Sequence, residues 1–294
     1  MSDKSRISWT DATWNPVTGC SRVSPGCDHC YAERLTAGRL SKQPRYANLT
    51  DQYGQWSGEL RCHPDLLEVP LRWTKPRRIF VCSTSDLFHP KVPWEFILRV
   101  FDVMAAADRH TFQVVTKRPG RMAYFAEQVW PKQGGHWDPI NPVEAKRGVW
   151  PGTKWPAHVW AGTSVESQKY APRLDCLARV PAKVRFVSVE PLLGPVDLWR
   201  WLTWTGDDGM KEPPQPPVLH WVIVGGESGP GARPMHEDWV RNLRDQCSSS
   251  GVAFFYKQAI ISGRKIDTPM LDGRQWKEFP DALQRSSEAQ GFRP

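Results

Sequence analysis

The sequence predicts an α/β fold built on a parallel sheet, as a full or partial (β/α) barrel, with a doubly wound open sheet as the alternative. Two observations predict it. Short apolar runs rich in β-branched and aromatic residues recur along the chain, and amphipathic helical segments lie between several of them. Runs of this length are typical of strands buried on both faces, which occur in parallel sheets. Six or seven strand–helix units fit a barrel better than a small open sheet.

Each predicted strand is a run of about five apolar residues that ends in a polar signature. The runs occupy residues 78–86, 111–119, 158–166, 184–195, 220–229 and 252–258, and residues 7–20 supply one more strand. Helical periodicity predicts helices over residues 94–107, 167–180 and 237–250. Pro93 suits the start of the first helix, and Gly251 suits the end of the last.

The polar signatures are the candidate functional residues. In a parallel α/β barrel, the residues that follow the strands lie at the carboxyl-terminal mouth, where active sites form. The plainer alternative is that strand ends are polar because strands end at solvent. The candidates are Ser83, Ser85, Asp86, Lys117, Arg118, Ser164, Glu166, Glu190, Gly225, Gly226 and Glu227.

Length and composition are those of a globular protein with a core. The 294 residues are 40% apolar and 24% charged, and we expect one domain over 1–294 with insertions at about 127–156 and 198–219. No apolar stretch is long enough to span a membrane, and the amino terminus lacks a secretory apolar region, so a cytoplasmic location with reduced thiols is expected. Clustered cysteines there indicate a metal site or catalysis.

The chain is basic, with a net charge of +8 and 16 tryptophans, several of them in the two insertions. A basic surface with aromatic residues favours nucleic acid as a partner, because bases stack on aromatic rings and phosphates attract cations. The alternative is a solvated basic surface, with tryptophans that only cover the outer wall of the fold.

Three of the seven cysteines lie close together in GCSRVSPGCDHCYAE, residues 19–33, called here the cysteine loop. Cys20, Cys27 and Cys30 have the spacing Cys-x6-Cys-x2-Cys, directly after the first predicted strand. A structural zinc ion needs a fourth ligand, for which His29, Cys62 and His63 are candidates. A [4Fe–4S] cluster held by three thiolates leaves one iron open to a small molecule.

Several segments together carry a family resemblance. The stretch from ISWTDATWNPVTGC through the cysteine loop, followed by FVCSTSDLFHP, SVEPLLGPVDL and VIVGGESGPGARPMHEDW, resembles a phage- and prophage-associated family of three-cysteine-motif proteins of unknown function. That family in turn is similar to radical S-adenosylmethionine enzymes, including the spore photoproduct lyase group, which place a cysteine loop after the first strand of a βα barrel. Most such enzymes use Cys-x3-Cys-x2-Cys, so the first spacer here is longer.

The resemblance implies a barrel of the radical S-adenosylmethionine type, with a [4Fe–4S] cluster on Cys20, Cys27 and Cys30. It implies that S-adenosylmethionine binds the open iron and yields a 5′-deoxyadenosyl radical, for modification or repair of a nucleic acid or nucleotide. The implied cofactor-binding residues are the strand-end candidates: Ser83, Ser85 and Asp86 for the methionine amino group, Lys117 or Arg118 for its carboxylate, Ser164 and Glu166 for the ribose, Gly225, Gly226 and Glu227 for the adenine or ribose, and Glu190 for cofactor or substrate.

Two other functions stay open at this point. One is a zinc- or cluster-stabilised module that binds nucleic acid without catalysis. The other is a cluster-bearing subunit that depends on a separately encoded partner protein.

Overall fold

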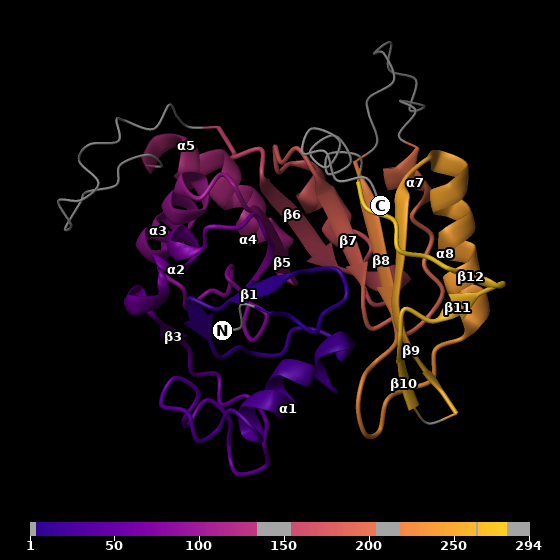
Figure 1. Ribbon diagram of the computed structural model, residues 1–294, viewed down its shortest axis with the longest axis horizontal. Helices are drawn as coiled ribbons and strands as arrows, with labels where there is room; N and C mark the ends of the chain where they lie inside the picture. The colour runs from indigo at the N-terminus through magenta and orange to yellow at the C-terminus, as the bar shows by residue number, and fades with distance from the viewer. Residues whose placement is uncertain (1–3, 134–153, 204–217, 263, 281–294) are drawn as a thin grey trace. The chain divides into compact units, whose positions relative to one another are not determined.

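The computed structural model describes residues 4–133, 154–203, 218–262 and 264–280, which form two compact units (Figure 1). The first unit comprises Met1–Arg22, Ala32–Trp160 and Arg179–Lys183, and the second comprises Val23–Tyr31, Ala161–Ala178 and Val184–Pro294. The boundary passes through the cysteine loop, so Cys20 belongs to the first unit, and Cys27 and Cys30 belong to the second.

The main sheet has eight strands in the order β1-β4-β5-β6-β7-β8-β9-β10. Because the parallel strands follow one another in sequence order without reversal, this is the order of a partial barrel and not of a doubly wound sheet. The predicted α/β class is therefore confirmed, and the open-sheet alternative is wrong. The strands are β1 (Ala12–Trp14), β4 (Arg78–Val81), β5 (Thr111–Thr116), β6 (Val159–Ser164), β7 (Arg185–Val189), β8 (Trp221–Gly225), β9 (Ala253–Ile261) and β10 (Arg264–Asp267).

The described residues also form four shorter strands and several helices. The strands β2 (Val17–Thr18) and β3 (Arg61–Cys62) pair with each other, as do β11 (Met270–Leu271) and β12 (Arg274–Gln275). The helices are α1 (Tyr31–Ala37), α2 (Val69–Arg72), α3 (Trp94–Ala106), α4 (Pro119–Tyr124), α5 (Trp130–Gln133), α6 (Arg173–Ala178), α7 (Trp199–Leu202) and α8 (Glu237–Ser250), with single turns η1 (Pro25–Cys27), η2 (Pro64–Leu66), η3 (Phe125–Val129) and η4 (Gln168–Tyr170).

In the first unit, β4 pairs in parallel with β1 and β5. Helix α3 begins after Pro93, and one face of it is buried, including Ile97, Phe101 and Met104, while Trp94 and Leu98 are partly exposed. An aromatic cluster forms around Phe101, whose ring lies 5.4 Å from that of Trp130 and 4.8 Å from that of Trp155. These two tryptophans of the first predicted insertion are thus core residues rather than a surface for bases.

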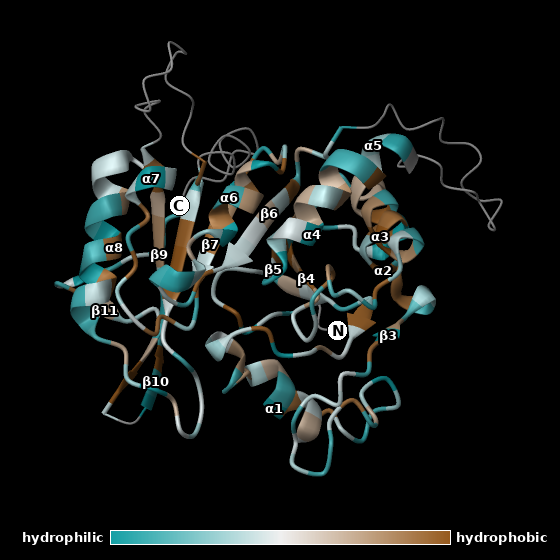
Figure 2. Ribbon diagram, turned by 180° about the vertical axis from the view of Figure 1, so that it is seen from behind, coloured by the Kyte–Doolittle hydropathy of each residue, from teal (hydrophilic) through white to brown (hydrophobic). Residues whose placement is uncertain are grey.

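In the second unit, β7, β8 and β9 pair in parallel, and α8 runs alongside β9 (Figure 1). Helix α8 is largely teal and white in Figure 2, while β9 carries brown tones, because only one face of the helix is buried. Gly251 ends α8 with φ +69°, a left-handed conformation that favours glycine.

Strand β6 is buried along its whole length, as a central strand of a parallel sheet should be. A Cβ on Gly162 would lie 2.6 Å from the ring of Phe186 in β7. The glycine therefore lets the neighbouring strand carry a large aromatic residue against β6.

Three boundaries differ from the sequence predictions. Residues 127–133 of the first predicted insertion continue the helical stretch through η3 and α5, and residues 134–153 lie outside the described residues. The second insertion begins with α7, and residues 204–217 lie outside the described part. The helix predicted over 167–180 is split into η4 and α6 around Pro172, which interrupts helical hydrogen bonding. Within the described residues, no helix is long and apolar enough to cross a membrane.

Candidate functional site

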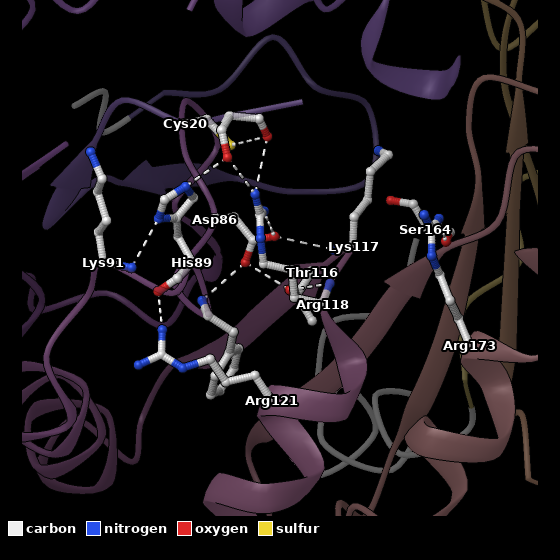
Figure 3. Close-up of polar contacts among 12 residues, drawn as sticks. Cys20, Asp86, His89, Lys91, Thr116, Lys117, Arg118, Arg121, Ser164 and Arg173 are labelled. Carbon is white, nitrogen blue, oxygen red and sulfur yellow. Dashed lines mark hydrogen bonds and ion pairs between the residues drawn. The ribbon is translucent and has the colours of Figure 1, made fainter. Parts of the chain in front are cut away.

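The first unit holds one group of predicted site residues at the carboxyl ends of β4 and β5. Asp86 follows β4, and its carboxylate accepts four hydrogen bonds: from Phe88 N (2.9 Å), Thr116 Oγ1 (2.7 Å), Lys117 N (3.2 Å) and Arg118 NH1 (2.8 Å). Asp86 and Arg118 are both nearly buried. The pair joins the end of β4 to the end of β5 (Figure 3).

Arg118 also reaches the start of the cysteine loop. Its NH2 donates to Ser21 O and to Ser21 Oγ, each at 3.0 Å, and Figure 3 shows the guanidinium between Asp86 and Cys20. Burial alone would lower the pKa of Arg118, but the Asp86 carboxylate, together with Cys20, outweighs burial and raises that pKa. A cation beside a thiol favours the thiolate, which is the form that binds metals.

His89 supports the same residue of the cysteine loop. Its Nδ1 accepts from Lys91 N at 3.1 Å, and its Nε2 lies 2.8 Å from Ser21 Oγ. Because Nδ1 is an acceptor, the ring is neutral and Nε2 carries the hydrogen. Burial and the charge of Arg118 lower the pKa of His89 to about 4.

The two serines after β4 attach this strand end to the amino-terminal segment. Ser83 Oγ donates to Asn15 Oδ1 at 3.1 Å, and Ser85 Oγ donates to Val17 O at 2.7 Å. Both bonds anchor the backbone from which the cysteine loop departs. Binding of a methionine amino group by Ser83, Ser85 or Asp86 stays a prediction.

The second unit places one glutamate after each of three successive strands: Glu166 after β6, Glu190 after β7 and Glu227 after β8. Each of the three is nearly or fully buried and paired with a cation. Buried carboxylates need such partners, because desolvation of an unpaired charge is costly. The glutamates that the sequence places at the ends of three successive strands are thus members of three ion pairs.

Glu166 is fully buried, and its Oε2 accepts from Arg173 NH1 at 2.8 Å, while Arg173 NH1 also donates to Ser164 O (Figure 3). Glu166 Oε1 has no hydrogen-bond partner among the residues that the structure describes. A Cβ on Gly26 of the cysteine loop would lie 3.1 Å from Glu166 Cδ. The loop therefore packs directly on Glu166, and an open acceptor is left in a buried position.

Glu190 Oε2 accepts a hydrogen bond from Ser188 Oγ (2.9 Å), and Glu190 Oε1 forms an ion pair with Lys257 Nζ at 2.9 Å. A Cβ on Gly225 would lie 2.8 Å from Glu190 Oε1, whereas one on Gly226 would meet Met235 only at ordinary contact distance. The group that approaches Gly225 closely is therefore Glu190, and an approach of adenine or ribose to Gly225 and Gly226 stays a prediction.

Glu227 accepts from Arg233 N (2.8 Å) and Arg233 Nε (3.1 Å), and it also accepts from Arg233 NH2. His29 Nδ1 lies 3.0 Å from Glu227 Oε2. Burial alone would raise the pKa of Glu227, but the hydrogen bonds and charge of Arg233 outweigh burial and hold that pKa below its usual range. His29, Glu227 and Arg233 are called here the Glu227 cluster.

The three cysteines of the loop are thiols, each partly exposed. Cys27 ends η1, with its amide bonded to Ser24 O at 2.8 Å, and Cys30 precedes α1. Across the described ranges, no three or more His, Cys, Asp and Glu side chains are gathered as a preformed metal site. Cys20 lies in the first unit, whereas Cys27 and Cys30 lie in the second.

The cations of the second unit have no signal in the sequence. Arg173, Arg233 and Lys257 each pair with a predicted glutamate, but none lies at the end of the strand that carries that glutamate. Arg173 begins α6, Arg233 lies in the loop before α8, and Lys257 lies within β9. His29 was weighed only as a metal ligand, and its contact with Glu227, 198 residues away, has no local signal in the sequence. Of the other cysteines, Cys82 and Cys247 are buried, and Cys176 is partly buried.

Comparisons with known proteins give one family and several solved structures. A family model described as a protein of unknown function (DUF5131) matches residues 4–280. A spore photoproduct lyase carrying a cysteine-to-serine mutation is similar at 12% identity, with a TM-score of 0.45 over 85% of this chain and 75% of that one. Spore photoproduct lyase complexed with dinucleoside spore photoproduct is similar at 13% identity, with a TM-score of 0.41 over 93% of this chain and 69% of that one. No curated protein matches.

Proposed function

Because the chain belongs to the DUF5131 family, whose description assigns no activity, we propose a function from its own residues: a radical S-adenosylmethionine-type iron–sulfur enzyme. The observation that carries the proposal is the position of the cysteine loop. The Cys-x6-Cys-x2-Cys sequence directly follows β1 and β2, at the start of a parallel sheet whose strand order is that of a partial barrel.

The donor set fits a [4Fe–4S] cluster. Three partly exposed thiols on one short loop are the ligands that such clusters use, and Arg118 beside Cys20 favours its thiolate. Cys20, Cys27 and Cys30 would hold the cluster and leave one iron without a protein ligand. When bound, the cluster supplies one electron that cleaves S-adenosylmethionine to methionine and a 5′-deoxyadenosyl radical.

The chain's own residues would bind and shield the cofactor. Glu166 Oε1 is a buried acceptor without a described partner, which suits a ribose hydroxyl. The side chains of Lys117 and Ser164 would add a cation and a hydroxyl at the strand ends. Gly225 and Gly226 place no side chain at the end of β8. The carboxylates would act chiefly by orienting their cations: Asp86 orients Arg118, Glu190 orients Lys257, and Glu227 orients Arg233.

Anaerobic purification with iron and sulfide analysis tests the cluster. The expected result is a coloured protein with about four irons and four sulfides per chain, as a cubane cluster requires. Incubation with S-adenosylmethionine and a strong reductant should then release 5′-deoxyadenosine. If the cluster is intact but no 5′-deoxyadenosine forms, the result would favour a cluster-bearing binding protein or partner subunit instead.

A zinc-stabilised module is the second candidate, and one contact favours it. His29 Nδ1 faces the Glu227 carboxylate, an arrangement that also orients metal-bound histidines through their other nitrogen. In that case His29 Nε2 would be the fourth ligand, and purification would give a colourless protein with one zinc ion that is lost in the variant His29→Ala.

The substrate class that we propose is nucleic acid or a nucleotide, supported by the net charge of +8. Binding of a fluorescent single-stranded oligonucleotide should weaken steeply as salt increases from 50 to 200 mM, with a slope set by the number of phosphates contacted. A flat salt dependence, or no binding, would favour a separately encoded partner protein as the source of substrate recognition.

A further inference from the structure

The part of the cysteine loop that carries Cys27 and Cys30 is held to the second unit by one group of charged residues. Arg233 NH2 donates to Pro25 O at 2.7 Å, and Arg233 NH1 lies 3.6 Å from Asp28 Oδ2. His29, between the two cysteines, bonds to Glu227. Residues 23–31 are therefore attached on both sides of Cys27.

Glu227 is the centre of this attachment. Only 3% of its side chain is exposed, and it lies two residues after the end of β8, so the sheet fixes its backbone. Its oxygens accept hydrogen bonds from the backbone amide and the guanidinium of Arg233. These bonds orient the guanidinium so that its NH2 donates to Pro25 O. Pro25 O also accepts from Asp28 N, at 3.2 Å, so Arg233 bonds to the turn that contains Cys27.

We propose that the Glu227 cluster positions the cysteine loop. It orders residues 23–31 before any metal binds, so that Cys27 and Cys30 already have the geometry in which they bind the iron–sulfur cluster. This inference rests on the proposed iron–sulfur function. Groups that orient metal ligands contribute strongly to metal affinity. If the loop is ordered before the metal binds, the entropic cost of ordering it does not reduce the affinity for the metal. It gives Glu227 a role through the loop, in addition to the predicted contact with adenine or ribose.

The variant Glu227→Gln tests the proposal. Both carboxylate oxygens accept from Arg233, so in either orientation the amide NH2 of glutamine faces a donor. The matched control is Asp272→Asn, which removes a carboxylate bonded to Arg241 and Arg244 in the same unit, away from the cysteine loop. Asparagine tolerates the positive φ of 51° at that position.

Three measurements are made on the full chain, purified anaerobically. Hydrogen exchange of the Cys27 and Asp28 amides should become about tenfold faster or more in Glu227→Gln, and iron release to a chelator should become about 10–100-fold faster. The electron paramagnetic resonance spectrum of the reduced cluster should change, which a purely structural residue would not cause. In Asp272→Asn all three should match the parent protein.

Unchanged exchange in Glu227→Gln would overturn the inference, because the loop would then be ordered without Glu227. Faster exchange with unchanged iron release and spectrum would overturn it too, while the proposed function would stand. A parent protein that binds no iron under reconstitution would overturn the proposed function and, with it, this inference, and that result is distinct from the other two.

Discussion

Asp86 Oδ2 lies 2.8 Å from Arg118 NH1, and the same guanidinium donates to Ser21 next to Cys20. One nearly buried ion pair thus connects the ends of β4 and β5 to the first residues of the cysteine loop. The pair therefore affects the stability of the first unit and the position of the backbone next to Cys20.

Removing one partner of this pair should be costly. We expect Asp86→Ala to lower the free energy of unfolding by about 3–5 kcal/mol, because Arg118 is left buried without its counter-ion. Urea unfolding measures the change. The control is Asp65→Ala: Asp65 pairs with Arg45 at 2.7 Å, but both side chains are exposed, so the loss should stay near 0.2–1 kcal/mol. Equal losses would mean that burial of the Asp86 pair has no energetic weight.

The neutral His89 predicts a loss of stability in acid. Its pKa of about 4 in the folded protein lies below the value of 6.5 for an unperturbed histidine, so the unfolded state binds more protons between these values. Stability should therefore be complete above about pH 6.5 and fall as the pH decreases toward 4, by at most about 1.4 kcal/mol per pH unit from this residue. In His89→Asn, whose side-chain oxygen can replace Nδ1 as acceptor, urea unfolding across this range should show a shallower slope. An identical slope would assign the acid sensitivity to other groups.

Gly162 should tolerate no side chain. In Gly162→Ala, the new Cβ would meet the Phe186 ring at 2.6 Å between two buried strands, so we expect a loss of about 1–3 kcal/mol from overpacking. The control Gly194→Ala has its nearest neighbour at 3.9 Å and should be close to neutral. Thermal unfolding of the two variants separates the outcomes, and a neutral Gly162→Ala would show that β6 and β7 can move apart.

The cysteine motif predicts a sharp difference between two thiols of the second unit. Cys27→Ser should lose the iron–sulfur cluster and the formation of 5′-deoxyadenosine, because two thiolates cannot hold three corners of a cubane. Cys176→Ser, on α6 and equally intermediate in exposure, should retain both. Iron analysis and product chromatography measure the two effects. Product formation in Cys27→Ser would show that Cys27 is not a ligand.

Much of the fold was predictable because its signals are local. Buried parallel strands are short apolar runs, and β4 through β8 all fall within the predicted ranges, while β9 begins within its range and continues to Ile261. Helices α3 and α8 have clear periodicity and end signals at Pro93 and Gly251. The split between η4 and α6 was missed because periodicity continued across Pro172.

The site was predictable only in part. Carboxylates at strand ends stand out in a sequence, and so Glu166, Glu190 and Glu227 could be found. Their cations could not, because Arg173 in α6, Arg233 in a loop and Lys257 in β9 look like any solvated cations in the sequence until folding places each beside its partner. The same holds for His29, whose neighbours in the chain are cysteines and whose partner is Glu227.

By itself, the sequence determined the strand–helix order, the polar ends of the strands and the spacing of three thiols, since each depends on residues close together in the chain. Only the tertiary structure decided which cation meets which carboxylate: Arg118 with Asp86, Arg173 with Glu166 and Arg233 with Glu227. The physical reason is that a buried charge must find a partner within hydrogen-bonding distance, and that distance is set by the packing of the strands and turns rather than by separation along the chain.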